Sequence, residues 1–166
     1  MRVLRRARPE DADALAAILR ASMHGAMPWL PELHTPEEDR WFVSEIVLPN
    51  EEVWITEVDE RPVGFAALGS RDGEAYLQHL YVAPEHQSRG LGSELMNRAK
   101  ERRPEGFRLW VFQKNHGARR FYERHGCRLV ELTDGSGNEE REPDALYAWE
   151  PKSSHASRKE VSGHMG

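Results

Sequence analysis

The 166 residues of the chain suffice for one domain with a buried core, and a composition of 39% hydrophobic and 31% charged residues excludes a wholly disordered chain. The formal net charge of −5 argues against a nucleic-acid-binding protein, and no apolar run approaches the ~20 residues of a membrane span. The single cysteine, Cys127, excludes an internal disulfide, and the N-terminus lacks an apolar signal core, so we expect a cytoplasmic protein without nucleic-acid or membrane partners.

The first third of the chain predicts one strand and two helices. Residues 3–6 favour a short strand, and Pro9 begins a helix whose apolar positions recur at helical spacing. Two prolines and a glycine make residues 24–34 a loop. Thr35 and Glu38 have the spacing of a capping box, which predicts a second helix that ends near Pro49.

The middle of the chain predicts a meander of three antiparallel strands. Strand-forming residues dominate 53–58, 63–68 and 75–82, and turn residues separate these segments. A helix follows, and with the next strand at 107–112 it makes a parallel crossover connection.

The last elements are a helix and two closing strands. Asn115 suits the N-cap of a helix that Gly126 terminates, and residues 127–132 and 145–149 favour strands. The expected fold is therefore α/β (α+β), with a mixed, mainly antiparallel sheet of six or seven strands and about four helices. We expect one domain over 1–150 and a disordered tail over 151–166.

Residues 87–92 join a strand to a helix through two glycines and an arginine. A helix N-terminus exposes backbone amides, and glycine lets a phosphate approach them, so the segment suits a diphosphate. Neither familiar phosphate loop fits, because Leu95 stands where the dinucleotide fingerprint has its third glycine and Ser93 where the P-loop has lysine. A tight turn without a ligand is the alternative interpretation.

The same segment resembles the acetyl-CoA signature of the GNAT superfamily of N-acetyltransferases, (Q/R)-x-x-G-x-(G/A). The helix after residue 112 is similar to the family pattern N-x-x-A-x-x-F-Y-x-x-x-G, matched by Asn115, Ala118, Phe121, Tyr122 and Gly126. The order of elements agrees over residues 1–150. The resemblance implies the GNAT fold, in which strands four and five splay apart, and acetyl-CoA as cosubstrate with no metal.

The resemblance also implies the residues that bind the cosubstrate. Leu80, Tyr81 and Val82 would bind the pantetheine arm through backbone groups, and one of their amides would polarise the thioester carbonyl. Asn115 would meet the same arm. The diphosphate would be held by the residues of the glycine segment and the one after it: Gln87, Ser88, Arg89, Gly90, Leu91, Gly92 and Ser93.

Tyr122 is the candidate general acid. When an amine attacks the thioester, the expelled thiolate needs a proton, and a phenol of pKa ~10 suits a poorly solvated thiolate. The alternative is that Phe121 and Tyr122 are adjacent packing aromatics.

No residue of the sequence stands out as the general base. The family's base positions correspond to Tyr76 and Gln78, which are not bases, and strand alternation directs His79 to the opposite face. Glu74, a relay through water or a neutral amine remains open.

The acceptor site is expected near the loop between the first two helices. Its apolar residues would line a groove or cap the core, and Glu139 and Glu140 would attract a cation or mark a solvated hairpin tip. The candidate substrate-binding residues are Met27, Trp29, Leu30, His34, Tyr76 and Gln78.

These observations favour an enzyme that transfers acetyl from acetyl-CoA to a primary amine of a small molecule or peptide. The alternatives are a non-catalytic acyl-CoA-binding sensor or regulatory module of the same fold, and an interaction domain with a glycine turn. The family is often dimeric, and the sequence leaves a homodimer open.

Overall fold

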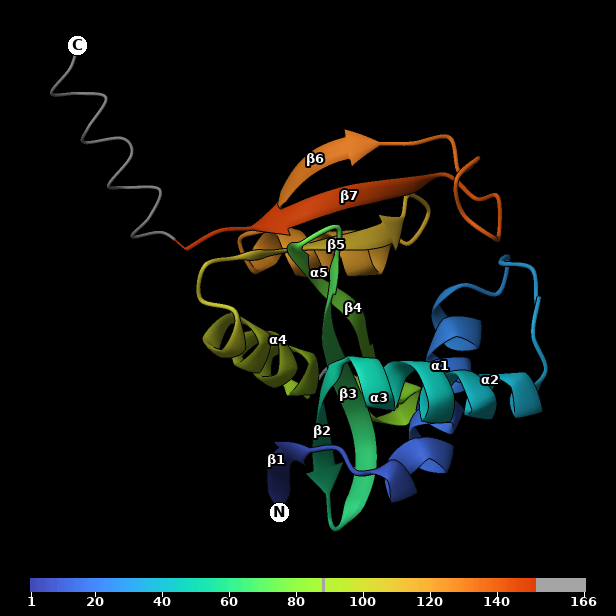
Figure 1. Ribbon diagram of the computed structural model, residues 1–166, viewed down its shortest axis with the longest axis vertical. Helices are drawn as coiled ribbons and strands as arrows, with labels where there is room; N and C mark the ends of the chain where they lie inside the picture. The colour runs from blue at the N-terminus through green and yellow to red at the C-terminus, as the bar shows by residue number, and fades with distance from the viewer. Residues whose placement is uncertain (88, 152–166) are drawn as a thin grey trace, which may run out of the picture.

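The computed structural model describes residues 1–87 and 89–151. Within them the strands form one seven-stranded sheet in the order β1-β2-β3-β4-β5-β7-β6 (Figure 1). All neighbouring strands are antiparallel except β4 and β5, which confirms the predicted mixed sheet. The strands are β1 (Arg2–Arg6), β2 (Glu52–Val58), β3 (Arg61–Arg71), β4 (Glu74–Val82), β5 (Phe107–Phe112), β6 (Arg128–Leu132) and β7 (Asp144–Trp149).

Four helical segments longer than one turn occur in this part of the chain, where the sequence predicts them. The second is continuous through a π-helical stretch at Val43–Val47, and its predicted capping box is present: Glu38 N donates to Thr35 Oγ1 (3.1 Å) and Thr35 N to Glu38 Oε1 (2.8 Å). No helix among the described residues is both long and apolar enough to cross a membrane. The helices are α1 (Ala12–Ala26), α2 (Pro36–Phe42) with α3 (Leu48–Asn50), α4 (Leu91–Arg102) and α5 (His116–Arg124).

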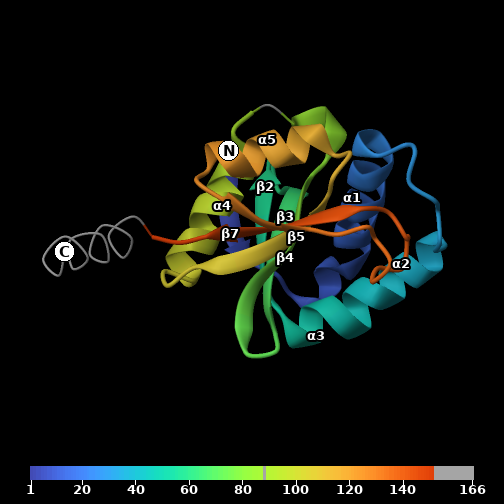
Figure 2. The same ribbon diagram turned by 90° about the horizontal axis from the view of Figure 1, so that it is seen from above.

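Two hydrophobic cores lie on opposite faces of the sheet. Figure 2 shows the sheet nearly edge-on, with α1, α2 and α3 on one side and α4 on the other. Strand alternation explains the division in β2, because Val53 and Ile55 pack in the core with α1 while Glu52 and Trp54 meet arginines of α4. The predicted tail lies outside the described residues apart from Pro151.

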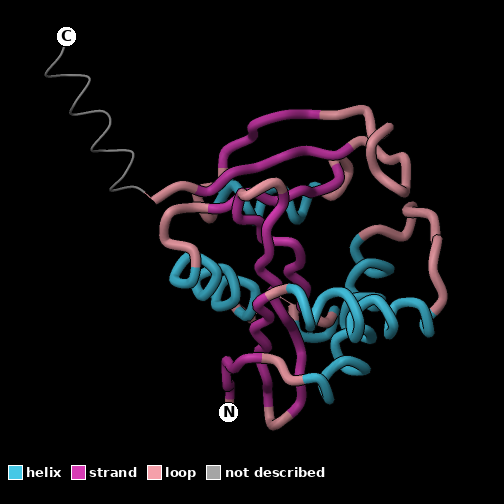
Figure 3. Tube along the Cα trace, in the orientation of Figure 1, coloured by secondary structure: helices cyan, strands magenta, loops and turns pink. Residues whose placement is uncertain are grey.

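Strands β4 and β5 separate soon after they begin, as predicted. Their register pairs Tyr76 with Arg108 only, and in Figures 1 and 3 the group β5–β7 turns away from β1–β4 beyond that point. A bulge in β4 leaves Gln78 as the extra residue opposite β3. The gap between the two strands is the feature of the fold that positions the site.

Candidate active site

A cavity of about 1020 Å³ lies where β4 and β5 separate. Its lining comes from both faces of the sheet, with α1 on one side and α4 and α5 on the other. Because β4 pairs with β5 only at Tyr76, backbone groups of β4 beyond that point on this edge have no strand partner among the described residues, and those that accept no side-chain hydrogen bond are available to a ligand. The predicted site residues that line the cavity are Met27, Gln78, Leu80, Tyr81, Val82, Gln87, Gly90, Gly92, Ser93, Asn115 and Tyr122.

The other predicted residues have different positions. Leu91 is 1% exposed and packs in the core, so only its backbone can serve a ligand. Arg89 is exposed, and its carbonyl accepts a hydrogen bond from Arg2. Ser88 lies outside the described residues. Of the acceptor candidates, the cavity lining within the described residues does not include Trp29, Leu30, His34 or Tyr76.

The N-terminus of α4 has the geometry of an anion site. Gly90 is the N-cap in a left-handed conformation (φ 79°), and no side chain of the described residues caps this helix end. Glu94 N donates to Gly90 O (3.1 Å), so the first-turn amides before it have no intrahelical acceptor. A Cβ added at Gly90 would meet no described residue within 4 Å, and Gly90, Gly92 and Ser93 line the cavity, so a phosphate has room to approach this helix end.

The end of β4 is fixed by a pair of hydrogen bonds to one carbonyl. Val82 O accepts from Gln87 Nε2 (3.0 Å) and from Ser22 Oγ of α1 (2.8 Å). Ser22 is buried and was not predicted as a site residue, although a polar residue on the apolar face of a helix is a signal that sequence inspection can detect. Gln87 therefore acts here on the chain itself and orients the turn into α4.

Ser93 also has a protein partner that the sequence did not indicate. Its Oγ lies 3.0 Å from His125 Nε2, and Lys100 Nζ donates to the carbonyl of His125 (2.7 Å). Burial lowers the pKa of His125, and the cations Lys100 and Arg124 add to this effect. The contact joins the first turn of α4 to the end of α5.

Tyr122 lies on α5 against the cavity and is 9% exposed. Burial raises the pKa of its phenol well above the ordinary value, and Tyr81 and Cys127 reinforce the shift. The phenol is therefore protonated at neutral pH, which is the form a general acid requires. Cys127 is buried too, and burial raises the pKa of its thiol to about 12, so it is not a thiolate nucleophile.

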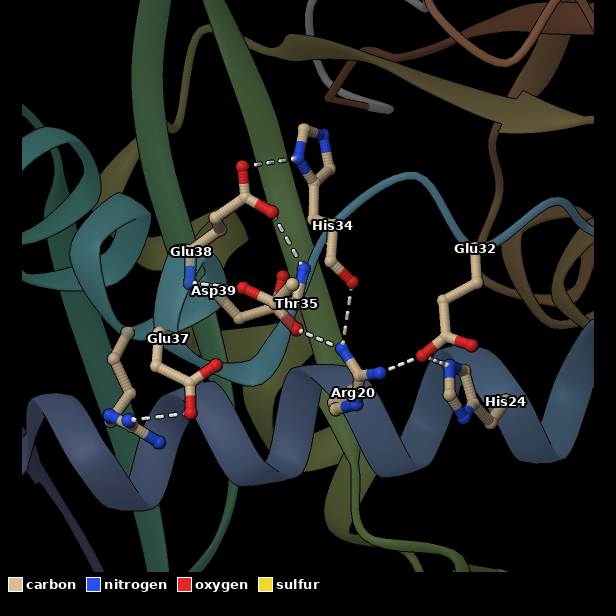
Figure 4. Close-up of polar contacts among 9 residues, drawn as sticks. Arg20, His24, Glu32, His34, Thr35, Glu37, Glu38 and Asp39 are labelled. Atoms are coloured by element: carbon tan, nitrogen blue, oxygen red, sulfur yellow. Dashed lines mark hydrogen bonds and ion pairs between the residues drawn. The ribbon is translucent and has the colours of Figure 1, made fainter.

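The loop after α1 is braced by Arg20. Figure 4 shows this guanidinium between Glu32, the carbonyl of His34 and Asp39; it lies 3.2 Å from the carbonyl and 2.8 Å from Asp39 Oδ2. Beyond the loop, His34 Nε2 lies 2.8 Å from Glu139 Oε1 in the β6–β7 loop. The two loops are thus joined beside the cavity.

We expect the His34–Glu139 pair to stabilise the fold at low pH only. The hydrogen bond with Glu139 raises the pKa of His34, so its contribution is complete below the unfolded pKa of about 6.5 and disappears as pH rises through the folded value. Both side chains are exposed, so the coupling free energy should stay below about 1 kcal/mol. A double-mutant cycle of H34A and E139A, measured by urea unfolding at pH 5.5 and 8.5, tests this; an equal coupling at both pH values would contradict it.

Among the described residues, no group of three or more His, Cys, Asp or Glu side chains is placed to hold a metal ion. The cavity combines three features: the exposed amides at the N-terminus of α4, the edge of β4 beyond its pairing with β5, and the protonated phenol of Tyr122. These groups suit a reaction that binds an anionic carrier and protonates a leaving group.

Comparison with known proteins gives a consistent result. Residues 13–127 match the profile described as "Acetyltransferase (GNAT) family". An uncharacterized N-acetyltransferase of Archaeoglobus fulgidus is 30% identical over 152 residues, which are 82% of this chain and 99% of that protein. The peptidyl-lysine N-acetyltransferase YiaC of Escherichia coli is 34% identical over 89 residues, 54% of this chain and 58% of its own length.

Solved structures share the fold at low sequence identity. PaiA N-acetyltransferase from Thermoplasma acidophilum, in complex with coenzyme A, aligns with a TM-score of 0.75 and 21% identity, covering 90% of this chain and 99% of that one. The ribosomal-protein-S18-alanine N-acetyltransferase of Escherichia coli aligns with a TM-score of 0.69 and 18% identity, covering 90% and 94%.

Proposed function

Since this chain belongs to the GNAT acetyltransferase family, whose cosubstrate is acetyl-CoA, we propose that it transfers the acetyl group to a primary amine by direct attack. The observation that carries the proposal is one cavity that contains both the N-terminus of α4 and Tyr122 of α5, in the gap between β4 and β5. The first group suits the diphosphate and the second suits the sulfur at the other end of the pantetheine arm.

The residues present fit acetyl-CoA along its length. The amides of Leu91, Gly92 and Ser93 and the open space at Gly90 accommodate the diphosphate. The edge of β4 from Leu80 to Val82 offers backbone donors and acceptors to the pantetheine amides, apart from Val82 O, which already accepts from Gln87 and Ser22. Asn115 lies in the same wall.

The chemistry then needs two protein contributions at the thioester. A backbone amide of β4 donates to the carbonyl oxygen as negative charge develops there; loss of one such donor typically costs ~10²–10³ in rate. Tyr122 gives its phenolic proton to the sulfur as the C–S bond breaks, and it recovers a proton from the new amide nitrogen.

An exposed primary amine is positively charged at neutral pH, which suits a protein with a formal net charge of −5. The lysine side chain is one such amine. YiaC, the peptidyl-lysine N-acetyltransferase that matches 54% of this chain, makes lysine peptides the first acceptor class to test. Met27 lies just after α1 and lines the cavity. The ring of Trp29 packs edge-on against the ring of Phe112 in β5, with the ring centroids 6.3 Å apart, so the loop after α1 lies against the β5 side of the site.

The deciding experiment has two stages. Calorimetric titration with acetyl-CoA should show saturable one-to-one binding, and no heat at millimolar ligand would contradict the proposal. Release of free thiol with pooled small amines and lysine peptides should then exceed the amine-free rate. Binding without release would support a non-catalytic acyl-CoA-binding module instead.

A further inference from the structure

The cavity itself does not offer a free carboxylate to accept a proton from the amine. Asp144 is the one carboxyl group among its described lining residues, and its oxygens accept hydrogen bonds from Thr133 Oγ1 and from Asn138 Nδ2 (3.1 Å). His79 also lines the cavity, but burial lowers its pKa to about 4. Its imidazole is therefore a weak proton acceptor for an ammonium of pKa ~10.4.

A further carboxyl group lies directly behind the cavity wall. Glu51 directly precedes the Glu52–Leu68 pair of β2 and β3, which places it beside Gly69, and Gln78 also approaches Gly69. A Cβ added at Gly69 would be 3.1 Å from Glu51 Cγ and 3.4 Å from Gln78 Nε2. Because Gly69 has no side chain, the side chains of Glu51 and Gln78 can both lie close to its Cα. Gln78 lines the cavity, and Glu51 is therefore one side chain away from it.

The surroundings of Glu51 leave one of its carboxylate oxygens without a hydrogen bond. Its Oε1 is buried and has no hydrogen-bond partner among the described residues. Arg71 is the charged neighbour, and its Nε donates to Gln78 Oε1 (3.1 Å) rather than to Glu51. Glu52 points to the other face and pairs with Arg102 and Arg103. A buried carboxylate oxygen without a hydrogen bond is costly, and groups with a perturbed pKa concentrate at functional sites.

We propose that Glu51 is the proton acceptor for the incoming amine, acting from behind Gln78 at the bulge of β4. The inference rests on the proposed acetyl transfer. The substrate ammonium loses one proton to the Glu51 carboxylate through an intervening water, and the neutral amine attacks the thioester. The carboxylic acid then returns that proton to solvent, so the overall reaction releases one proton per acetyl group transferred.

The protonation behaviour of Glu51 fits this role. Burial raises its pKa to about 7, and the positive charge of Arg71 opposes part of that rise. A base is most effective when its pKa lies near the working pH, because it is then both available and strong enough. A carboxylate with an ordinary pKa near 4.3 would be a much weaker acceptor.

The test compares two adjacent glutamates. In the wild-type enzyme, kcat/KM for a lysine peptide should rise with pH through a midpoint near 7. E51Q should lose this limb and about 10²-fold or more of the rate at pH 8, while its Kd for acetyl-CoA stays unchanged. E52Q is the matched control: it removes the ion pairs with Arg102 and Arg103 and should keep the wild-type pH profile with a lower melting temperature.

A third variant separates a proton acceptor from a structural residue. R71Q removes the cation that lowers the pKa of Glu51, so the midpoint of the limb should move to higher pH. An E51Q enzyme that keeps the limb and most of its rate at pH 8 would overturn the inference, as would an R71Q profile shifted to lower pH. If the wild-type protein releases no thiol with any amine, the proposed function itself fails first, and the two failures are distinguishable.

Discussion

Replacing Tyr122 with phenylalanine is expected to lower kcat by about 10²–10⁴ and to leave the Kd for acetyl-CoA unchanged. The phenylalanine ring fills the same space on α5, so the packing around this buried position should persist. Only the proton that the departing sulfur needs is removed. Steady-state kinetics and calorimetry on the same preparation separate the two effects.

Tyr147 supplies the matched control. It is fully buried in β7, is not part of the cavity lining, and its hydroxyl donates to Glu123 Oε2 (2.6 Å) and accepts from Arg119 Nε (3.0 Å). Tyr147→Phe should lower stability by about 1–3 kcal/mol, because both partners lose a hydrogen bond, and should keep normal turnover. If Tyr122→Phe retains wild-type kcat, Tyr122 is a packing residue and another group protonates the sulfur.

Local patterns in the sequence were sufficient to predict most of the fold. The capping box at Thr35 and the glycine segment at residues 87–92 act within a few residues of themselves, so their structural outcome is encoded where they stand. The two family patterns predicted that Tyr122 and Gly90 belong to one site, and both residues line the same cavity.

Contacts between distant segments were not predictable in the same way. The bulge at Gln78 depends on the pairing of β4 with β3, and no residue in the strand signals it. In the sequence, Glu51 is one of two adjacent glutamates, a pattern typical of solvated residues. Only the folded sheet places it beside Gln78 with its Oε1 buried. His125 reaches Ser93 for the same reason: the contact joins the ends of two helices.

The glycine at the start of α4 permits a second large effect to be tested, this time on binding. Gly90→Val should weaken acetyl-CoA binding by about ten- to a hundredfold, or ~1.4–2.7 kcal/mol. The left-handed backbone at φ 79° disfavours a β-branched residue, and the added methyl groups occupy the open space in front of the helix amides. Both effects move the diphosphate away from its donors.

Gly73, in the β3–β4 turn, distinguishes loss of the site from loss of the fold. It has nearly the same backbone angle (φ 80°), and a Cβ there would also meet none of the described residues within 4 Å, but Gly73 is not among the described residues that line the cavity. Gly73→Val therefore carries a similar strain of about 1–2 kcal/mol without the intrusion. Calorimetry should show normal acetyl-CoA affinity in this variant and weak affinity in Gly90→Val, while thermal unfolding shows comparable stability losses. Equal affinities would mean that the helix N-terminus does not hold the diphosphate and that binding energy comes from the pantetheine arm along β4.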